Sequence, residues 1–350
     1  MRKLFIILAA VAFAFTFTTP AAAEVNFSGY VAFQTYLFDV DNPGAQKDSS
    51  DLNWTMDQVC TRFSANFKEG PVTGYVDLRP LAGAQTRHWW ATWNFGAGTF
   101  GIGQTWTPDF SCITGANYGC GAMTPIDAGC TARAPMAMVT LGGLKIAAID
   151  PNIPAAHPVA GYTDWETSLP KLNVAYNLNV AMVGLKLFAG YQSIADRNVT
   201  TDQTQDIDSY VYGITASAGF GPLTVKGMFY MAQNFAEYAA GTAYNYAAFW
   251  DGTKICDEEF TAYGVNLAYK VSDTLALSAS YVAGESELDR PGTYEDETSH
   301  YHVNATFTMA KGVTITPEFL VLDRGDVINA GVKTEQAVDT RYGVYWKIAF

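Results

Sequence analysis

Beyond residue 23 the chain has no apolar run long enough to cross a bilayer as an α-helix, which takes about 20 residues. A chain that enters a membrane without such a helix must close its strands into a barrel, because backbone groups in lipid find a complete set of partners in no other way. The missing helix therefore leaves two classes open, a β-barrel in a membrane and a β protein in water.

Positive charge is also scarce. The sequence has 21 Lys and Arg residues against 34 Asp and Glu residues, and its net charge is −13. Binding to nucleic acid phosphates needs clustered Lys and Arg. We therefore expect no nucleic acid partner. The carboxylates concentrate in segments that read as loops, including Glu285, Glu287 and Glu295, where divalent cations and lipopolysaccharide are the expected neighbours.

Motifs for metal binding and catalysis are missing as well. The five cysteines contain no CxxC pair, and residues 39–44 fail as a calcium loop because Pro43 occupies a ligand position. The candidates for catalysis are Ser299, His300 and His302, together with His88 on the opposite side of the expected barrel. No nucleophile motif surrounds them. We expect no metal, no cofactor and no enzymatic activity.

The first 23 residues have the pattern of a signal peptide. Arg2 and Lys3 give a positive start, residues 4–17 form an apolar core that is too short to span a bilayer, and residues 21–23 are three alanines. We therefore expect export, with residues 24–350 as a single mature domain.

Alternation of apolar and polar residues indicates strands along the whole of that domain, joined in turn by short and long connections. The final strand places Tyr342, Trp346 and Phe350 on one face and Arg341, Tyr345 and Lys347 on the other. One face of a barrel strand meets lipid and the other a wet lumen, which explains this pattern. The count is about sixteen strands, at residues 26–37, 59–67, 72–79, 87–95, 100–106, 136–141, 144–149, 169–177, 183–192, 210–219, 223–233, 260–270, 275–284, 299–309, 313–322 and 341–350. The last strand should pair with the first.

Two stretches, residues 60–70 and 87–108, carry a family resemblance. An Arg-led strand, a Gly-rich turn and a strand that ends in Thr107-Pro108 are similar to the general bacterial porins. The resemblance implies an all-β transmembrane barrel of sixteen antiparallel strands with an inward-folded third loop, assembled as a homotrimer in the bacterial outer membrane. The second loop, between Arg79 and Arg87, is short. This leaves two alternatives: trimer contacts that rest on apolar barrel surface alone, or a barrel that does not form a trimer.

The resemblance also implies a function, which is passive diffusion of small hydrophilic solutes and ions through a water-filled channel. In such a channel, basic side chains on the wall face acidic side chains on the third loop across a constriction. The residues that match the basic cluster of the family are Arg62, Arg87 and Arg133, and Arg79 adds a further lumen charge on the third strand. The acidic partners would be Asp109 and Asp127 in the loop.

Two features leave alternatives open. Trp89, Trp93 and Trp106 could line a solute-specific channel for sugars or anions, but alternation places them toward lipid or the interface. Cys112, Cys120 and Cys130 lie in the third loop and are the candidates for a disulfide in an oxidising periplasm. An odd cysteine total leaves one thiol unpaired, and we expect this to be Cys60.

Overall fold

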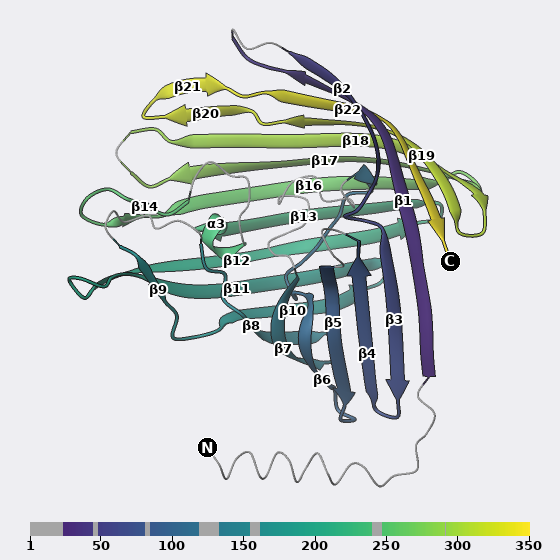
Figure 1. Ribbon diagram of the computed structural model, residues 1–350, viewed down its shortest axis with the longest axis horizontal. Helices are drawn as coiled ribbons and strands as arrows, with labels where there is room; N and C mark the ends of the chain where they lie inside the picture. Colours follow the sequence, from purple (N-terminus) through teal and green to yellow (C-terminus); the bar gives the residue numbers. More distant parts are fainter. Residues whose placement is uncertain are drawn as a thin grey trace.

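The computed structural model describes residues 24–44, 48–80, 85–118, 133–154, 162–239, 247–290 and 292–350. Sixteen strands form a closed antiparallel ring (Figure 1). The ring closes where β1 (Glu24–Asp41) pairs with β22 (Val338–Ala349) on one edge and β3 (Arg62–Glu69) on the other. The predicted pairing of the last strand with the first is therefore confirmed.

The other ring strands follow one another in chain order. They are β4 (Val72–Arg79), β5 (Gln85–Asn94), β6 (Thr99–Trp106), β7 (Arg133–Leu141), β8 (Leu144–Ile149), β10 (Lys171–Val180), β11 (Val183–Asn198), β12 (Gln203–Phe220), β13 (Leu223–Gln233), β16 (Glu258–Lys270), β17 (Leu275–Leu288), β18 (Glu295–Ala310) and β19 (Val313–Asp323). Each pairs with its sequence neighbour in the ring, so every connection joins adjacent strands and no crossover is needed.

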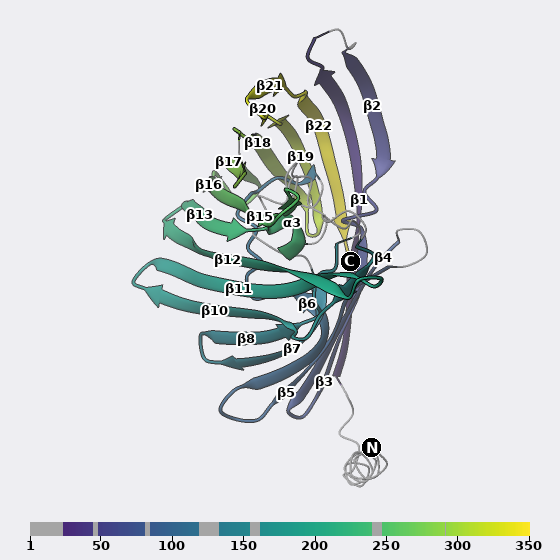
Figure 2. The same ribbon diagram turned by 90° about the vertical axis from the view of Figure 1, so that its left-hand side faces the viewer.

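Short turns and long connections alternate around the ring, as predicted. The long connections carry elements that alternation did not predict: β2 (Ser49–Met56), β9 (Asp164–Glu166), α3 (Phe235–Tyr238), β14 (Phe249–Trp250), β15 (Ile255–Cys256), β20 (Asp326–Asn329) and β21 (Val332–Glu335). Figure 2 shows α3 on the concave side of the sheet. No helix among the described residues is long and apolar enough to cross a membrane.

The two faces of each strand differ in exposure, as the sequence pattern requires. On β22, Trp346 and Ile348 point outward and are 40% and 58% exposed, whereas Tyr345 points inward and is 4% exposed. The inner face holds buried polar side chains such as Asn266, Asn304 and Glu318. An apolar outer band around a polar interior is the arrangement expected of a barrel in lipid.

The height of the wall is uneven. We call β3 to β8 the short wall, because these strands have 6 to 10 residues each. On the tall wall, formed by β11, β12, β13, β16, β17 and β18, the strands have 11 to 18 residues.

The predicted second strand begins too early. Residues 57–61 form a turn in which the Asp57 carboxylate accepts hydrogen bonds from the backbone N–H groups of Val59 and Cys60, each at 3.0 Å. Asp side chains stabilise such turns by bonding the backbone two or three residues further on. The strand therefore starts at Arg62, and β2 before the turn pairs with the far half of β1.

Closure of the ring should depend on Gly343, which lies opposite Tyr36 in the β1–β22 pair. A Cβ atom there would approach the Thr35 carbonyl oxygen to 2.1 Å. We expect Gly343→Ala to destabilise the folded barrel by about 1–3 kcal/mol, the usual range for overpacking. The measurement is the temperature at which unheated folded protein converts to the unfolded band on a gel. Gly219→Ala is the control, since a Cβ at Gly219 meets no atom within 4 Å; equal transition temperatures for both variants would contradict this role.

Candidate functional site

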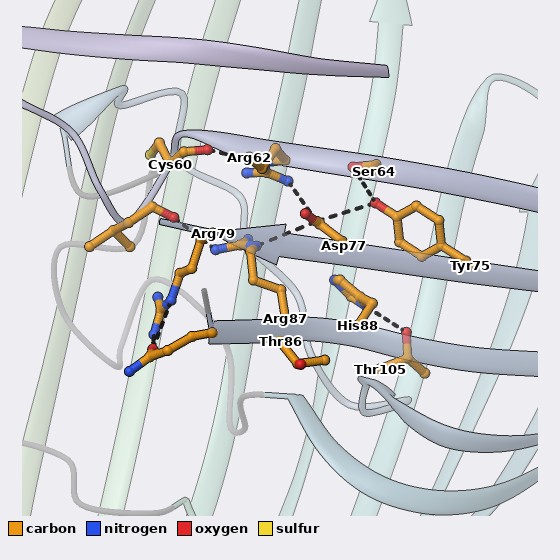
Figure 3. A network of polar contacts seen from close by, with 12 residues as sticks. Cys60, Arg62, Ser64, Tyr75, Asp77, Arg79, Thr86, Arg87, His88 and Thr105 are labelled. Atoms are coloured by element: carbon orange, nitrogen blue, oxygen red, sulfur yellow. Dashed lines mark hydrogen bonds and ion pairs between the residues drawn. The ribbon is translucent and has the colours of Figure 1, made fainter. Parts of the chain in front are cut away.

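Two arginines converge on one buried carboxylate on the inner face of the short wall. The Asp77 Oδ2 atom on β4 lies 3.6 Å from Arg62 Nη1 on β3 and 3.5 Å from Arg87 Nε on β5 (Figure 3). Asp77 and Arg87 are 0% and 4% exposed, whereas the Arg62 side chain is 24% exposed. Arg62 is therefore the member of this group that can meet a passing solute.

Arg87 owes its inward direction to a β-bulge. Asp77 pairs with His88 and Leu78 pairs with Thr86, so Arg87 is an extra residue on β5. Because of the bulge, two consecutive residues, Arg87 and His88, both become buried. Bulges re-aim side chains in this way. Trp89 and Trp93, beyond the bulge, point outward and are 63% and 52% exposed.

Hydrogen bonds fix the rest of this group. The Arg62 Nε and Arg87 Nη1 atoms donate to the carbonyl oxygens of Cys60 at 3.2 Å and Val59 at 2.9 Å. The Tyr75 hydroxyl donates to Asp77 Oδ2 at 3.2 Å. Both guanidinium groups are thus held by the turn before β3 as well as by Asp77, and their positions are set before any solute arrives.

Arg79 and Arg133 extend the same basic surface. Arg79 donates to Gln85 Oε1 at 2.7 and 3.1 Å. The Arg133 guanidinium lies 4.0 Å from the centre of the Trp106 ring, which stacks on Phe110 at 3.7 Å. Arg133 is also near enough to Arg87, Arg79 and Arg62 for electrostatic repulsion. The sequence-based expectation that Trp106 faces lipid or the interface is wrong, because its ring contacts inward-facing His88 and Arg133.

Residues 107–118, which we call the inner segment, follow β6 and contact the inner face of the tall wall. The Lys186 Nζ atom on β11 donates to the Phe110 carbonyl oxygen at 2.5 Å and to Ser111 Oγ at 3.0 Å. Further along, Ile113 packs in a cluster with Val282 of β17. These contacts hold the segment against the tall wall, while Phe110 also stacks on Trp106 at the end of β6.

Asp109 anchors the inner segment to α3. Asp109 is 0% exposed, and its Oδ2 atom accepts a hydrogen bond of 2.8 Å from the Tyr238 hydroxyl. The Tyr238 carbonyl oxygen in turn accepts from Lys171 Nζ at 2.6 Å. In the same helix, burial raises the pKa of Glu237 to about 7. The described contact of Asp109 is therefore with α3.

Glu318 on β19 holds the far end of the inner segment and was not singled out from the sequence. Its carboxylate accepts from the backbone N–H groups of Asn117 at 2.8 Å and Tyr118 at 3.0 Å, and from Asn304 Nδ2 at 3.0 Å. The sequence contained one signal for Glu318, which is a carboxylate on the face of a strand that alternation points inward. Its role as an anchor depends on a segment 200 residues away, which strand periodicity does not reveal.

The cysteines differ from expectation at Cys60, which is disulfide-bonded, so the prediction of an unpaired thiol there is wrong. The Cys112 Sγ atom is 3.6 Å from Thr114 Oγ1, and Cys256 is a buried free thiol. Cys120, Cys130 and Asp127, like the predicted signal peptide, lie outside the described residues.

The candidates for catalysis lie in the wall of the barrel. His300 and His302 on β18 are 0% and 1% exposed. The His302 Nδ1 atom is 2.5 Å from Ser280 Oγ on β17. The contact between His302 and Ser280 is explained as a polar contact between side chains of neighbouring strands.

Comparisons with known proteins agree with this architecture. The sequence profile described as Gram-negative porin matches residues 8–324, and no curated protein sequence matches the chain. The structure is similar to the outer membrane channel DcaP of Acinetobacter baumannii, with a TM-score of 0.73, 19% identity and coverage of 95% of this chain and 99% of that one.

Two further solved structures share the fold. For the outer membrane protein OmpT of Vibrio cholerae in its trimer form, the TM-score is 0.57 at 13% identity, with 94% and 100% of the two chains covered. For an anion-selective porin from Comamonas acidovorans, the TM-score is 0.58 at 12% identity, again with 94% and 100% covered. Together with the profile match over most of its length, the closed sixteen-stranded ring shows that the chain belongs to the Gram-negative porin family.

Proposed function

We propose that Arg62, Arg79, Arg87 and Arg133 form the basic side of the constriction of this porin and give it a preference for anions. The protein is a channel of the bacterial outer membrane through which small hydrophilic solutes and ions diffuse passively. The observation that carries the proposal is the charge of the short wall, where the four guanidinium groups outnumber the described carboxylates that interact with them, Asp77 and Asp57.

The electrostatic argument is direct. Among the described residues, Asp77 and Asp57 are the carboxylates that interact with these guanidinium groups. Two carboxylates balance two of the four guanidinium charges, so an excess of positive charge faces the lumen. Side chains of one charge at the narrowest part of a pore favour the passage of ions of the opposite charge. Low-dielectric walls focus this field into the water between them. The inner segment narrows the lumen from the opposite side, where Lys186 and Glu318 hold it.

We assign the acidic side of the constriction to Asp127. Asp109, the other acidic residue expected there, is buried against Tyr238 and acts as a positioning residue for the inner segment. Residues 1–23 are proposed as the signal peptide that directs export. The protein is not proposed as an enzyme, since the candidates His300 and His302 are buried in β18, where His302 contacts Ser280 of the neighbouring strand.

We further propose that outward carboxylates bind lipopolysaccharide through divalent cations. On β17 and β18, Glu285 lies opposite Glu297 and Glu287 lies opposite Glu295. Like charges placed directly opposite one another destabilise a sheet. Cations shared with lipopolysaccharide phosphates would relieve this repulsion at the outer rim.

Removing the charge of Arg62 should change the ion selectivity of the channel more than removing the charge of an arginine at the rim. In Arg62→Gln the permeability ratio of chloride to potassium should fall by about twofold, because a unit charge a few ångströms from an ion in water contributes on the order of 1 kcal/mol before salt screening. The measurement is the zero-current potential of single channels across a potassium chloride gradient. Arg197→Gln is the matched control, since Arg197 is paired with Glu166 and Asp202 at the end of β11. An equal shift in both variants, or no shift in Arg62→Gln, would refute the assignment.

The protein should assemble as a homotrimer through the outer surface of the short wall. Large apolar side chains lie there, among them Trp89, Trp93 and Phe63, and the structurally similar OmpT of Vibrio cholerae is described in a trimer form. We expect native mass spectrometry in detergent to show three chains per particle. Trp89→Ala with Trp93→Ala should shift the population toward monomer, whereas Tyr263→Ala with Tyr281→Ala on the tall wall should not. Monomer as the sole wild-type species would rule the proposal out.

A further inference from the structure

A cavity with mixed apolar and polar lining lies in the lumen, apart from the basic cluster of the short wall. It has a volume of about 330 Å³ and is bounded by Ser111, Cys112 and Ile113 of the inner segment and by residues of β10 to β13. This volume is at the small end of the range for ligand pockets, roughly 300–1,000 Å³. A solute of a few carbon atoms fits that space.

Two ammonium groups reach this cavity from neighbouring parts of the tall wall. Lys186 on β11 and Lys226 on β13 both line it. The hydrogen bonds from Lys186 to the Phe110 carbonyl oxygen and to Ser111 Oγ fix its ammonium group at the boundary between the wall and the inner segment. Lys226 pairs across the sheet with Ser217 and Asn266, and neither of these side chains can neutralise its charge.

The remaining polar lining consists of hydroxyl and amide groups. Thr215 and Ser217 on β12 and Asn179 on β10 lie among the described lining residues, none of which is Asp or Glu. Thr215 lies directly opposite Lys186, and Ser217 directly opposite Lys226. Each lysine therefore has a hydroxyl residue as its cross-strand neighbour, on a strand whose backbone runs about 5 Å away. Ammonium and hydroxyl donors together suit the oxygens of a carboxylate or phosphate group.

We propose that this cavity is a binding site for a small oxyanion, a carboxylated or phosphorylated solute, on the periplasmic side of the constriction. The site rests on the proposed function, because it serves solutes that have passed the arginines. Lys186 and Lys226 lie within a few residues of the short turns after β10 and β12, and short turns mark the periplasmic end of such barrels. An anion leaving the constriction meets this site before it reaches the periplasm.

Inorganic phosphate is the probe, added to potassium chloride on both sides of single channels in a planar bilayer. We expect phosphate to reduce the chloride current with a saturable dependence on concentration. Lys226→Gln should raise the half-blocking concentration by roughly tenfold, in line with the loss of a hydrogen bond to a charged group. Lys226→Arg keeps the charge and should retain binding to within about threefold.

Lys145→Gln is the matched control. Lys145 on β8 is another inward lysine near a short turn, and it does not line the cavity. If Lys145→Gln and Lys226→Gln raised the half-blocking phosphate concentration equally, the effect would come from the overall positive charge of the lumen and the site would be refuted. A wild-type channel that shows no saturable block by phosphate would refute it as well. Chloride current steps in every variant would show that each variant still forms an open channel. The ion selectivity of Arg62→Gln tests the constriction independently, so a failure of the oxyanion site can be distinguished from a failure of the proposed function.

Discussion

The structure depends on one constraint, the pairing of every backbone N–H and C=O group within the apolar layer of the membrane. No solvent is present there to replace a missing partner. The pairing of β1 with β22 removes the last free edge of the sheet, and the close approach at Gly343 makes that pairing possible. Once the ring is closed, alternation along each strand separates an apolar surface from a polar lumen.

The lumen is organised by the contrast between its two walls. The short wall presents guanidinium groups held by Asp77 and by the backbone of the turn before β3. The inner segment is held by Lys186 of the tall wall, by Tyr238 of α3 and by Glu318 of β19. On the proposed function, the charge of the short wall and the position of the inner segment together set the width and the electrostatic field of the passage.

Much of this fold could be predicted from the sequence, since strand number, the order of pairing and the outward tryptophans on β5 all follow from a two-residue period and turn residues. Features set by distant contacts could not. Periodicity alone would place Arg87 on the same face as Trp89, and the bulge that separates them needs the pairing with β4. Glu318 and α3 gain their roles from the inner segment, which no local pattern connects to them. The inward position of Trp106 was missed for the same reason.

The central claim is that arginines on the short wall control an open, anion-preferring passage. The most direct test is the conductance of the refolded wild-type protein in a planar bilayer across a potassium chloride gradient. The account predicts large, steadily open steps and a zero-current potential whose sign shows that chloride permeates more readily than potassium. A potential of the opposite sign would show that carboxylates govern the passage, and a folded barrel without steps would contradict the diffusion channel itself.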